Sequence, residues 1–259
     1  MSDIETKNDK QPASIYKEYT DGKWQETGAA LPDELGLHIF INGTELATLM
    51  CSPEKLNPLV VGFLTSEGII TGPEEITYLR VCIPDATAEV KLDREIKMPD
   101  RRVITSGCGG GTAFDMSSGM PPVTTTLVLT PEQVFQTVHL LQTSGKGTHK
   151  GMHASLLSNG REQVAGAEDI GRHNTMDKIL GECLMNDIST ADTILATTGR
   201  ISSEMLLKTA RMHIPVVASL NSATKQAAVL GEKLGITVIG YVRASRMSVY
   251  SHPERISQK

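Results

Sequence analysis

Three short apolar segments in the second half of the chain constrain the fold more than any other feature. Residues 193–197 (TILAT), 215–219 (PVVAS) and 236–241 (ITVIGY) are each predicted to be a strand. The segments between them predict helices, one beginning at Ser202 and one near residues 223–234. Strands that alternate with helices in this way form a sheet with helices on its faces. The sequence therefore predicts an α/β domain at this end of the chain.

The residues before these strands extend the same domain. Thr130 and Pro131 are suited to the cap and first turn of a helix, and Gln133 completes a capping box. Residues 154–158 and 163–167 predict a hairpin, and an amphipathic helix follows through Met176 and Leu184. We place the boundary of this C-terminal domain near residues 118–130 and assign it residues 126–259.

The first half of the chain is predicted to be a smaller, β-rich domain over residues 15–125, after a disordered leader at residues 1–14. Residues 37–50 alternate apolar and polar around Asn42-Gly43, a dipeptide that favours a type I′ turn in a hairpin. A helix is expected from Leu56 onwards, and short strands at residues 76–83 and 87–92. The fold class is therefore mixed α/β with two domains.

Composition excludes some classes of protein. No apolar run approaches the roughly 20 residues that cross a bilayer, and the N-terminus lacks the apolar core of a signal peptide. The formal net charge of −5 argues against generic nucleic-acid binding. Cys51, Cys82 and Cys183 lie in apolar surroundings and are predicted to be buried, which indicates a reducing compartment. We therefore expect a cytoplasmic protein that engages neither membrane nor nucleic acid.

Cys108 differs from the other cysteines because four glycines surround it in residues 107–111. Such a run predicts a loop with little side-chain bulk near the thiol. Accessibility and thiolate character make a cysteine reactive, so Cys108 is a candidate nucleophile or sulfur carrier. A simple exposed thiol in a flexible loop fits the same pattern equally well.

Residues 168–174 (EDIGRHN) place charged and polar side chains directly before the helix that contains Asp177. Asn174 is a suitable N-cap, and Arg172 could bind a phosphate with two nitrogens. The amides at this helix start would favour an anion. A surface loop with a capped helix is the plainer alternative, but the density of ionisable groups favours a functional site.

Polar loops also follow the three predicted strands, at residues 197–204, 219–224 and 241–246. In an open α/β sheet, ligands bind beyond the carboxyl ends of the strands. Each loop alone is explained by helix capping, whereas two in succession favour a nucleotide-sized site. Arg200, Arg243 and Arg246 are then candidates for phosphate, and His153 for the wall of the site. No metal motif is present, so zinc-protease and zinc-deaminase chemistry is not supported.

Several of these segments together resemble the FdhD family of sulfurtransferases, which active formate dehydrogenase requires. The resemblance covers roughly residues 35–255 and includes NGTELATLMCSPEKLNPLVVGFLTSEGII, AGAEDIGRHNTMDKILG, TTGRISSEMLLKTA and GITVIGYVRASRMSVYSHPER. The pairing of GRHN and a following DK with GRISSE is its most specific part.

The resemblance implies a fold, a reaction and partners. The C-terminal domain would be similar to cytidine deaminases without their zinc, and the protein would be a homodimer. Cys108 would accept persulfide sulfur from a cysteine desulfurase and pass it to the bis-molybdopterin guanine dinucleotide cofactor destined for formate dehydrogenase. The cofactor would be cargo, and no metal of the protein's own is expected. The residues implied or proposed to contact the cofactor are Tyr241, Val242, Arg243, Ala244, Ser245, Arg246, Arg172, His173, Asn174, Asp177, Arg200 and His153.

The chain departs from the family pattern at two points. A second cysteine often follows in the family loop, where this chain has Gly111. A relay between two loop cysteines is therefore not available, although one thiolate suffices to accept and donate sulfur. The family also often has a proline between Ala223 and Thr224. The alternatives left open are a guanine-nucleotide or cofactor chaperone without sulfur transfer, a deaminase-like hydrolase and an assembly scaffold.

Overall fold

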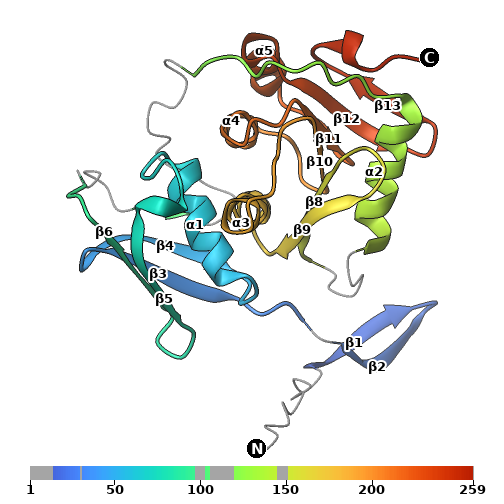
Figure 1. Cartoon of the computed structure of the whole chain (residues 1–259). Coiled ribbons are helices and arrows are strands. Elements are labelled where there is room, and N and C mark those ends of the chain that lie inside the picture. Colours follow the sequence, from blue (N-terminus) through green and yellow to red (C-terminus); the bar gives the residue numbers. More distant parts are fainter. Residues whose placement is uncertain (1–13, 30, 97–102, 106–119, 145–150, 259) are drawn as a thin grey trace, which may run out of the picture.

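The structure is a computed structural model that describes residues 14–29, 31–96, 103–105, 120–144 and 151–258 (Figure 1). The mixed α/β class predicted from the sequence is confirmed. The strands are β1 Ser14–Thr20, β2 Lys23–Ala29, β3 Leu35–Ile41, β4 Thr44–Cys51, β5 Ile76–Cys82, β6 Thr87–Leu92, β7 Val103–Thr105, β8 His153–Ser158, β9 Gln163–Asp169, β10 Ile194–Thr197, β11 Val216–Ser219, β12 Thr237–Arg243 and β13 Arg246–Val249. The helices are α1 Leu56–Ser66, α2 Pro131–Ser144, α3 Arg172–Met185, α4 Ser203–Arg211 and α5 Lys225–Leu234, with short 3₁₀ turns at Pro73–Glu75 and Pro253–Arg255.

A six-stranded sheet in the order β13-β12-β11-β10-β8-β9 organises the C-terminal part of the chain. β10, β11 and β12 are parallel, as the alternation of strands and helices predicts, and β8, β9 and β13 are antiparallel to their neighbours. Apolar residues of α2 pack on one face of this sheet, and those of α3, α4 and α5 pack on the other. The result is a three-layer unit whose parallel strands end at one common edge.

Side chains cap the N-terminal ends of α2 and α4. Thr130 N–H donates to Gln133 Oε1 (2.9 Å) and Gln133 N–H donates to Thr130 Oγ1 (3.3 Å), which is the predicted capping box at the start of α2. Ser202 caps α4 by accepting from the backbone N–H of Met205. These caps fix where each helix begins relative to the strand before it.

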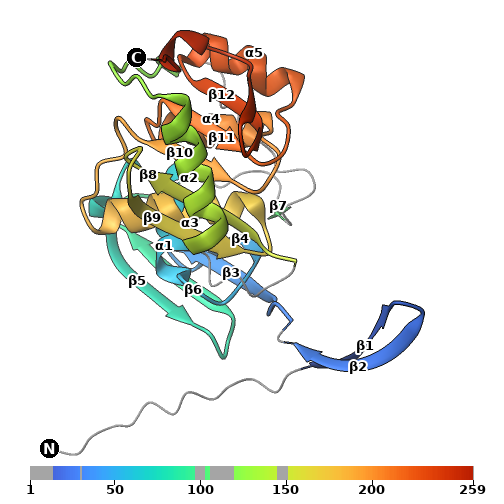
Figure 2. The same cartoon turned by 90° about the vertical axis from the view of Figure 1, so that its right-hand side faces the viewer.

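A five-stranded sheet in the order β5-β6-β3-β4-β7 forms the N-terminal part. The predicted hairpin is β3 and β4, and both turn residues have positive φ (49° at Asn42, 82° at Gly43), as a type I′ turn requires. α1 covers one face of this sheet with Leu59, Val60 and Leu64, all fully buried. The opposite face carries no helix among the described elements (Figures 1 and 2).

Two glycines bring α1 and α3 into direct backbone contact. A Cβ added to Gly62 would lie 1.8 Å from the carbonyl oxygen of Asp177, and one added to Gly181 would lie 1.8 Å from that of Pro58. Any larger residue at either position would collide with backbone, because no side chain is present to move aside. The backbones of α1 and α3 are therefore in direct contact at Gly62 and Gly181.

Two buried ion pairs join the same two parts of the chain. Lys178 Nζ lies 2.6 Å from Asp169 Oδ2 and donates to Ser52 Oγ (2.8 Å), with both charged side chains fully buried. Lys208 Nζ lies 2.8 Å from both carboxylate oxygens of Asp177 and 2.7 Å from Ser66 Oγ. Because Ser52 and Ser66 belong to the N-terminal part, each buried cation is satisfied only when both parts are in place.

Some expectations need correction or lie outside the described residues. The hairpin of β1 and β2 was not predicted from the sequence, and its first residue, Ser14, was assigned to the disordered leader. The rest of the predicted leader, residues 1–13, lies outside the described residues. Cys51 and Cys183 are buried as predicted, but Cys82 is only half-buried and its thiol donates to Asp85. The boundary between residues 125 and 126 stays a prediction.

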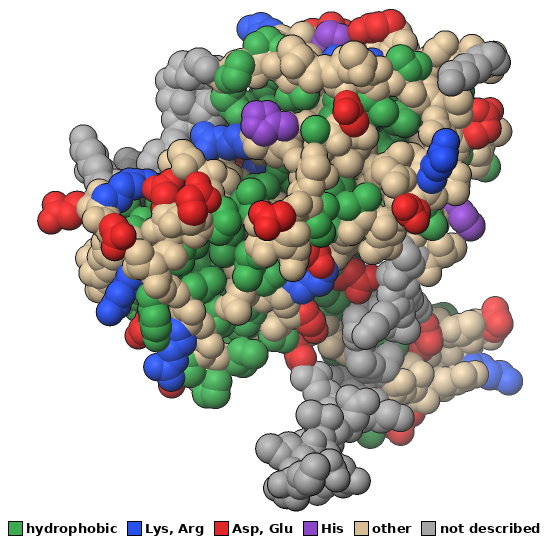
Figure 3. All heavy atoms as spheres, in the orientation of Figure 1, with side chains coloured by type: hydrophobic (Ala, Val, Ile, Leu, Met, Phe, Trp, Pro, Cys, Tyr) green, Lys and Arg blue, Asp and Glu red, His purple; other side chains and the backbone are tan. Residues whose placement is uncertain are grey.

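No helix within the described ranges is long and apolar enough to cross a membrane. Acidic and basic side chains are interspersed over the face of the molecule in Figure 3.

Candidate functional site

The carboxyl ends of β10, β11 and β12 are held together by a small hydrogen-bond network. Asn221 Nδ2 donates to the Thr198 carbonyl (2.8 Å), and the Tyr241 N–H donates to the Asn221 carbonyl (2.9 Å). Ser219 Oγ donates to the Gly199 carbonyl (2.6 Å) and accepts from the Asn221 N–H (2.9 Å). The three polar loops predicted to meet at one edge of the sheet therefore do meet, and they brace one another.

Arg172 and His173 open α3 at this same edge. The arginine stem lies against Gly199, where an added Cβ would come within 3.0 Å of Arg172 Cβ and 3.1 Å of its Cδ. Arg172 Nε and His173 Nε2 are both buried and have no hydrogen-bond partner among the described residues. Buried polar nitrogens without hydrogen-bond partners are rare in folded proteins, so these two atoms mark a place where water or a ligand can form hydrogen bonds.

The electrostatic surroundings of His173 keep its imidazole neutral. Burial first, and then the nearby Lys208, Arg172 and His153, lower the pKa of His173 to about 3. Its Nε2 lies 3.5 Å from Glu204 Oε2. At neutral pH this pair is not an ion pair, so His173 presents a neutral ring beside the Arg172 guanidinium.

His153 lies at the same edge of the sheet, and its role in the wall of a site stays a prediction. It is the first residue of β8, and its Nδ1 lies 3.4 Å from Thr198 Oγ1. Thr198 Oγ1 also accepts from the Ala154 N–H (3.0 Å), which ties β8 to the loop after β10. Half-burial and the nearby Arg172 charge lower the pKa of His153.

Asp169 connects the start of α3 to the end of β4. Besides Lys178, its carboxylate accepts from the Gly171 N–H and Asn174 Nδ2 (2.8 Å each) and from the Ser52 N–H (3.0 Å). The sequence prediction that Asn174 is the N-cap of this helix is wrong, because Gly171 is the N-cap and Asn174 lies in the first turn. Asn174 Nδ2 also donates to the Met50 carbonyl (2.8 Å), so its side chain links the first turn of α3 to β4.

Asp177 faces the interface between α1 and α4, away from the loops at the strand ends. It is buried against Lys208, and Ser66 Oγ donates to it (2.7 Å). Burial opposes the charge on Lys208, but Asp177 and Glu67 raise the lysine pKa, so the ammonium is retained. These contacts give Asp177 a structural role, and its proposed contact with the cofactor stays a prediction.

The segment from Tyr241 to Arg246 is a tight connection between two strands. The sequence predicts a loop here after the last strand, but β12 continues to Arg243 and β13 begins at Arg246. Tyr241, Arg243 and Arg246 are exposed, as are Ala244 and Ser245, whereas the Val242 side chain is buried against the α2 layer. Arg200 is also exposed, in the loop after β10.

Several residues of this region were not singled out from the sequence. Thr198 and Asn221 were within predicted loops, but their bracing bonds depend on partners from other strands. Lys208 gave no signal at all, because it occupies an ordinary position in an amphipathic helix. Cys108 lies outside the described residues. Within the described part of the chain, no three His, Cys, Asp or Glu side chains gather as a metal site would require.

Comparison with known proteins identifies the relatives of this chain. The model of the FdhD/NarQ family matches residues 32–257. The chain belongs to the FdhD/NarQ family. The family match spans both sheets and every described residue of the strand-end site, so the resemblance seen in the sequence motifs is confirmed.

Curated relatives and a solved structure agree with this assignment. The chain is 38% identical over 256 residues to the sulfur carrier protein FdhD of Staphylococcus haemolyticus, covering 95% of this chain and 96% of that protein. It is 36% identical to the sulfur carrier protein FdhD of Listeria monocytogenes, covering 93% and 97%. The crystal structure of a protein from Desulfotalea psychrophila, named as a formate dehydrogenase accessory protein, matches with a TM-score of 0.80 and 29% identity over 95% of this chain and 98% of that one.

Proposed function

We propose that this protein carries sulfur as a persulfide on Cys108, from a cysteine desulfurase to the bis-molybdopterin guanine dinucleotide cofactor of a formate dehydrogenase. The names of the FdhD relatives support a sulfur-carrier role in general. The cofactor, the desulfurase and the part played by Cys108 are the proposal. The observation that carries it is a pair of buried nitrogens, Arg172 Nε and His173 Nε2, that make no hydrogen bond to the described part of the chain and lie beside the ends of three parallel strands.

The geometry of that edge suits the diphosphate of a guanine dinucleotide. A guanidinium beside a helix start favours phosphate oxygens, and the neutral His173 ring can add a hydrogen bond without adding charge. Arg200, Arg243 and Arg246 are exposed around the same loops and are available for the second phosphate group. The hydrogen bonds of Asn221 and Ser219 fix the loops at the strand ends before a ligand binds, which lowers the conformational entropy lost on binding.

The position of β7 supports a role for Cys108 near this edge. β7 runs parallel to β4, with Thr105 opposite Leu49, and the next residue, Met50, accepts the hydrogen bond from Asn174 at the start of α3. Cys108 comes three positions after Thr105 in the sequence, and three residues of chain span at most about 10 Å. This short spacing in the sequence supports the role proposed for Cys108.

The sulfur chemistry has two steps. The Cys108 thiolate attacks the terminal sulfur of the desulfurase persulfide, so one S–S bond forms, another breaks, and the desulfurase thiolate leaves. Delivery of that sulfur as sulfide then consumes two electrons, which a thiol reductant supplies as it is oxidised to a disulfide. Cys108 returns to the thiolate for the next cycle.

Mass spectrometry tests the first step. The protein is incubated with a cysteine desulfurase and cysteine, and we expect a gain of one sulfur atom that dithiothreitol removes and that Cys108→Ala lacks. An unmodified protein that still binds guanosine diphosphate would instead support the chaperone without sulfur transfer, with Gly111 as the reason.

Nucleotide binding tests the site separately. We expect Arg172→Ala to weaken guanosine diphosphate binding by about tenfold or more, since a charge-assisted hydrogen bond contributes about 1.5–3 kcal/mol. Arg161→Ala is the matched control. Arg161 is exposed in the turn between β8 and β9, whereas the candidate site lies at the opposite end of β8, beside His153. Equal affinity in the two variants would refute the phosphate assignment.

A further inference from the structure

Three buried hydroxyl side chains, which we call the hydroxyl cluster, lie just inside the edge of the sheet that carries the candidate site. Ser155 in β8, Thr175 in α3 and Thr197 in β10 are 2%, 0% and 0% exposed, respectively. Ser155 Oγ lies 2.7 Å from Thr175 Oγ1 and 3.1 Å from Thr197 Oγ1. The hydroxyl cluster therefore joins two strands of the six-stranded sheet to α3.

The hydroxyl cluster occupies a face of the sheet that is otherwise apolar. Ser155 pairs with Thr197 across β8 and β10. Two residues further from the site, Leu157 pairs with Leu195 in the same register, and both leucines are fully buried in the core under α3. A hydroxyl group in such a core costs free energy unless it is hydrogen-bonded, whereas an apolar side chain would fill the same space without that cost. Packing alone therefore does not account for the hydroxyl groups at this level of the sheet.

The two ends of the hydroxyl cluster reach two residues of the candidate site, Arg172 and Gly199. Thr175 Oγ1 donates to the Arg172 carbonyl (2.7 Å), and the Gly199 N–H donates to Thr197 Oγ1 (3.2 Å). Gly199 in turn lies against the stem of Arg172, as its 3.0 Å limit for an added Cβ shows. The hydroxyl cluster, Gly199 and the arginine stem therefore form a closed ring of contacts.

This ring of contacts fixes the base of the Arg172 side chain. Arg172 Nε has no hydrogen-bond partner among the residues that the structure describes, so a bond at this atom does not set the direction of the guanidinium. The direction depends instead on where the backbone places the stem and on its packing against Gly199. Because a hydrogen bond weakens steeply with distance and angle, a small shift of the stem would weaken its contact with a phosphate oxygen.

We propose that Ser155, Thr175 and Thr197 are positioning residues, which hold Arg172 in the orientation that binds phosphate. The inference rests on the proposed function, because it requires that this edge of the sheet binds the diphosphate of a guanine nucleotide. The three hydroxyl groups do not touch the ligand themselves. They act through the start of α3 and through the loop after β10.

Removal of one hydroxyl group tests this role, with binding measured by isothermal titration calorimetry. Thr197→Val keeps the shape of the side chain but removes the acceptor of the Gly199 N–H. We expect the dissociation constants of guanosine diphosphate and of inorganic pyrophosphate both to rise by about fivefold to tenfold, because the contacts that weaken are those with phosphate. Thr197→Ser retains the hydroxyl group and should stay within about twofold of the unmodified protein.

Thr137→Val is the matched control for the loss of a buried hydroxyl group. Thr137 is also 0% exposed, but its hydroxyl donates to the Gln133 carbonyl inside α2, on the other face of the sheet. Circular dichroism shows whether each variant is folded. Ser155→Ala removes the central hydroxyl of the cluster and should weaken binding as Thr197→Val does, so it takes the place of that variant if Thr197→Val does not fold.

A double variant separates positioning from a general loosening of the site. Because the hydroxyl cluster acts through Arg172, Thr197→Val should raise the dissociation constant of guanosine diphosphate by less than about twofold when Arg172→Ala is already present. A general loosening would weaken binding by the same factor with either residue at position 172. That result, or an affinity in Thr197→Val equal to that in Thr137→Val, refutes the positioning role and leaves the proposed function in place.

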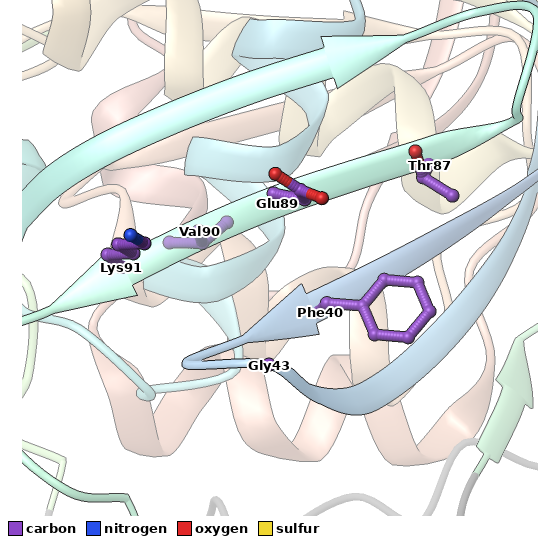
Figure 4. A pocket seen from close by; sticks show the side chains of 6 residues that line it. All are labelled: Phe40, Gly43, Thr87, Glu89, Val90 and Lys91. Carbon is purple, nitrogen blue, oxygen red and sulfur yellow. The ribbon is translucent and has the colours of Figure 1, made fainter.

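A groove on the open face of the five-stranded sheet provides the control for binding elsewhere. Its volume is about 420 Å³, and an aromatic ring and an ammonium group within it could meet a base and a phosphate (Figure 4). The groove is lined by Phe40, Gly43, Thr87, Glu89, Val90 and Lys91. Lys91→Ala should change the dissociation constant of guanosine diphosphate by less than about twofold. If Lys91→Ala weakens binding and Arg172→Ala does not, or if the unmodified protein binds no guanosine diphosphate, the phosphate site and the positioning role are both refuted.

Discussion

Replacing Gly181 by alanine tests how tightly the two parts of the molecule are joined. In a helix without tertiary contacts this change is stabilising by about 1 kcal/mol, because glycine is a poor helix former. Here the new Cβ would lie 1.8 Å from the Pro58 carbonyl oxygen, 2.6 Å from its carbonyl carbon and 2.8 Å from its Cα. All three are backbone atoms of α1, so α1 and α3 themselves must separate by more than about 1 Å.

That separation also strains the polar contacts across the helices. Ser66 on α1 donates to Asp177 on α3 at 2.7 Å and accepts from Lys208 at 2.7 Å. Overpacking of a core costs about 1–3 kcal/mol or more, and each weakened hydrogen bond adds about 1 kcal/mol. After subtracting the helix-propensity gain, we expect Gly181→Ala to lower the free energy of unfolding by about 3 kcal/mol.

Urea unfolding followed by circular dichroism measures the effect. Gly36→Ala is the control, because a Cβ there meets side-chain atoms at 3.5 Å and 3.7 Å, which is ordinary contact. Gly62→Ala should resemble Gly181→Ala, and the double variant should lose less than the sum of the two, since helices that are already separated accept the second methyl more easily. Stability in Gly181→Ala equal to or above that of the unmodified protein would refute the close packing of α1 and α3.

Other parts of the structure are tested by pH, by thiol chemistry and by removal of charge. The folded pKa of His173, about 3, is below the unfolded value of about 6.5, so the unfolded chain takes up the proton first and stability falls as pH drops below about 6.5. His173→Gln should remove about 2 kcal/mol of the stability lost between pH 7 and pH 5, measured by urea unfolding; an unchanged pH dependence would contradict the burial of a neutral ring. Burial first, then nearby carboxylates, raise the pKa of Cys51 to about 12 and of Cys183 to about 11, so iodoacetamide at pH 8 should label neither in the folded protein, as peptide mapping would show. Lys178→Met should lower the unfolding free energy by about 3–5 kcal/mol at pH 7, because Asp169 is left buried without its partner; a loss below about 1 kcal/mol would mean that water reaches this carboxylate.

The elements that could be predicted from the sequence are those fixed by local chemistry. The Asn42-Gly43 turn, the capping box at Thr130 and the strands of the parallel sheet each depend on neighbours within a few residues. The β1–β2 hairpin was not predicted although Asp21-Gly22 also favours a type I′ turn, because the residues on both sides of that turn are mostly polar and alternate little. β13 was also not predicted, since its four residues become a strand only by pairing with β12.

The candidate site was predictable in place but not in detail. The rule that ligands bind beyond the carboxyl ends of parallel strands located the three polar loops correctly. It could not separate the residues that face the edge from those that face the interior. Asn174 and Asp177 follow Arg172 within two turns of one helix, yet their partners come from β4, α1 and α4. The partners from β4 and α1 are more than 100 residues away in the sequence and leave no local signature.

The buried lysine pairs also affect how the chain folds during its synthesis on the ribosome, because their partners are far apart in the sequence. Ser52 and Ser66 find their partners 117 and 142 residues later, at Asp169 and Lys208. At about 5–20 residues per second, synthesis of that stretch takes on the order of ten seconds. During this interval the outward face of α1 has no α3 to cover it. Until α3 is synthesised, the first part of the chain therefore exposes an apolar surface. A nascent-chain chaperone would bind that surface during this period.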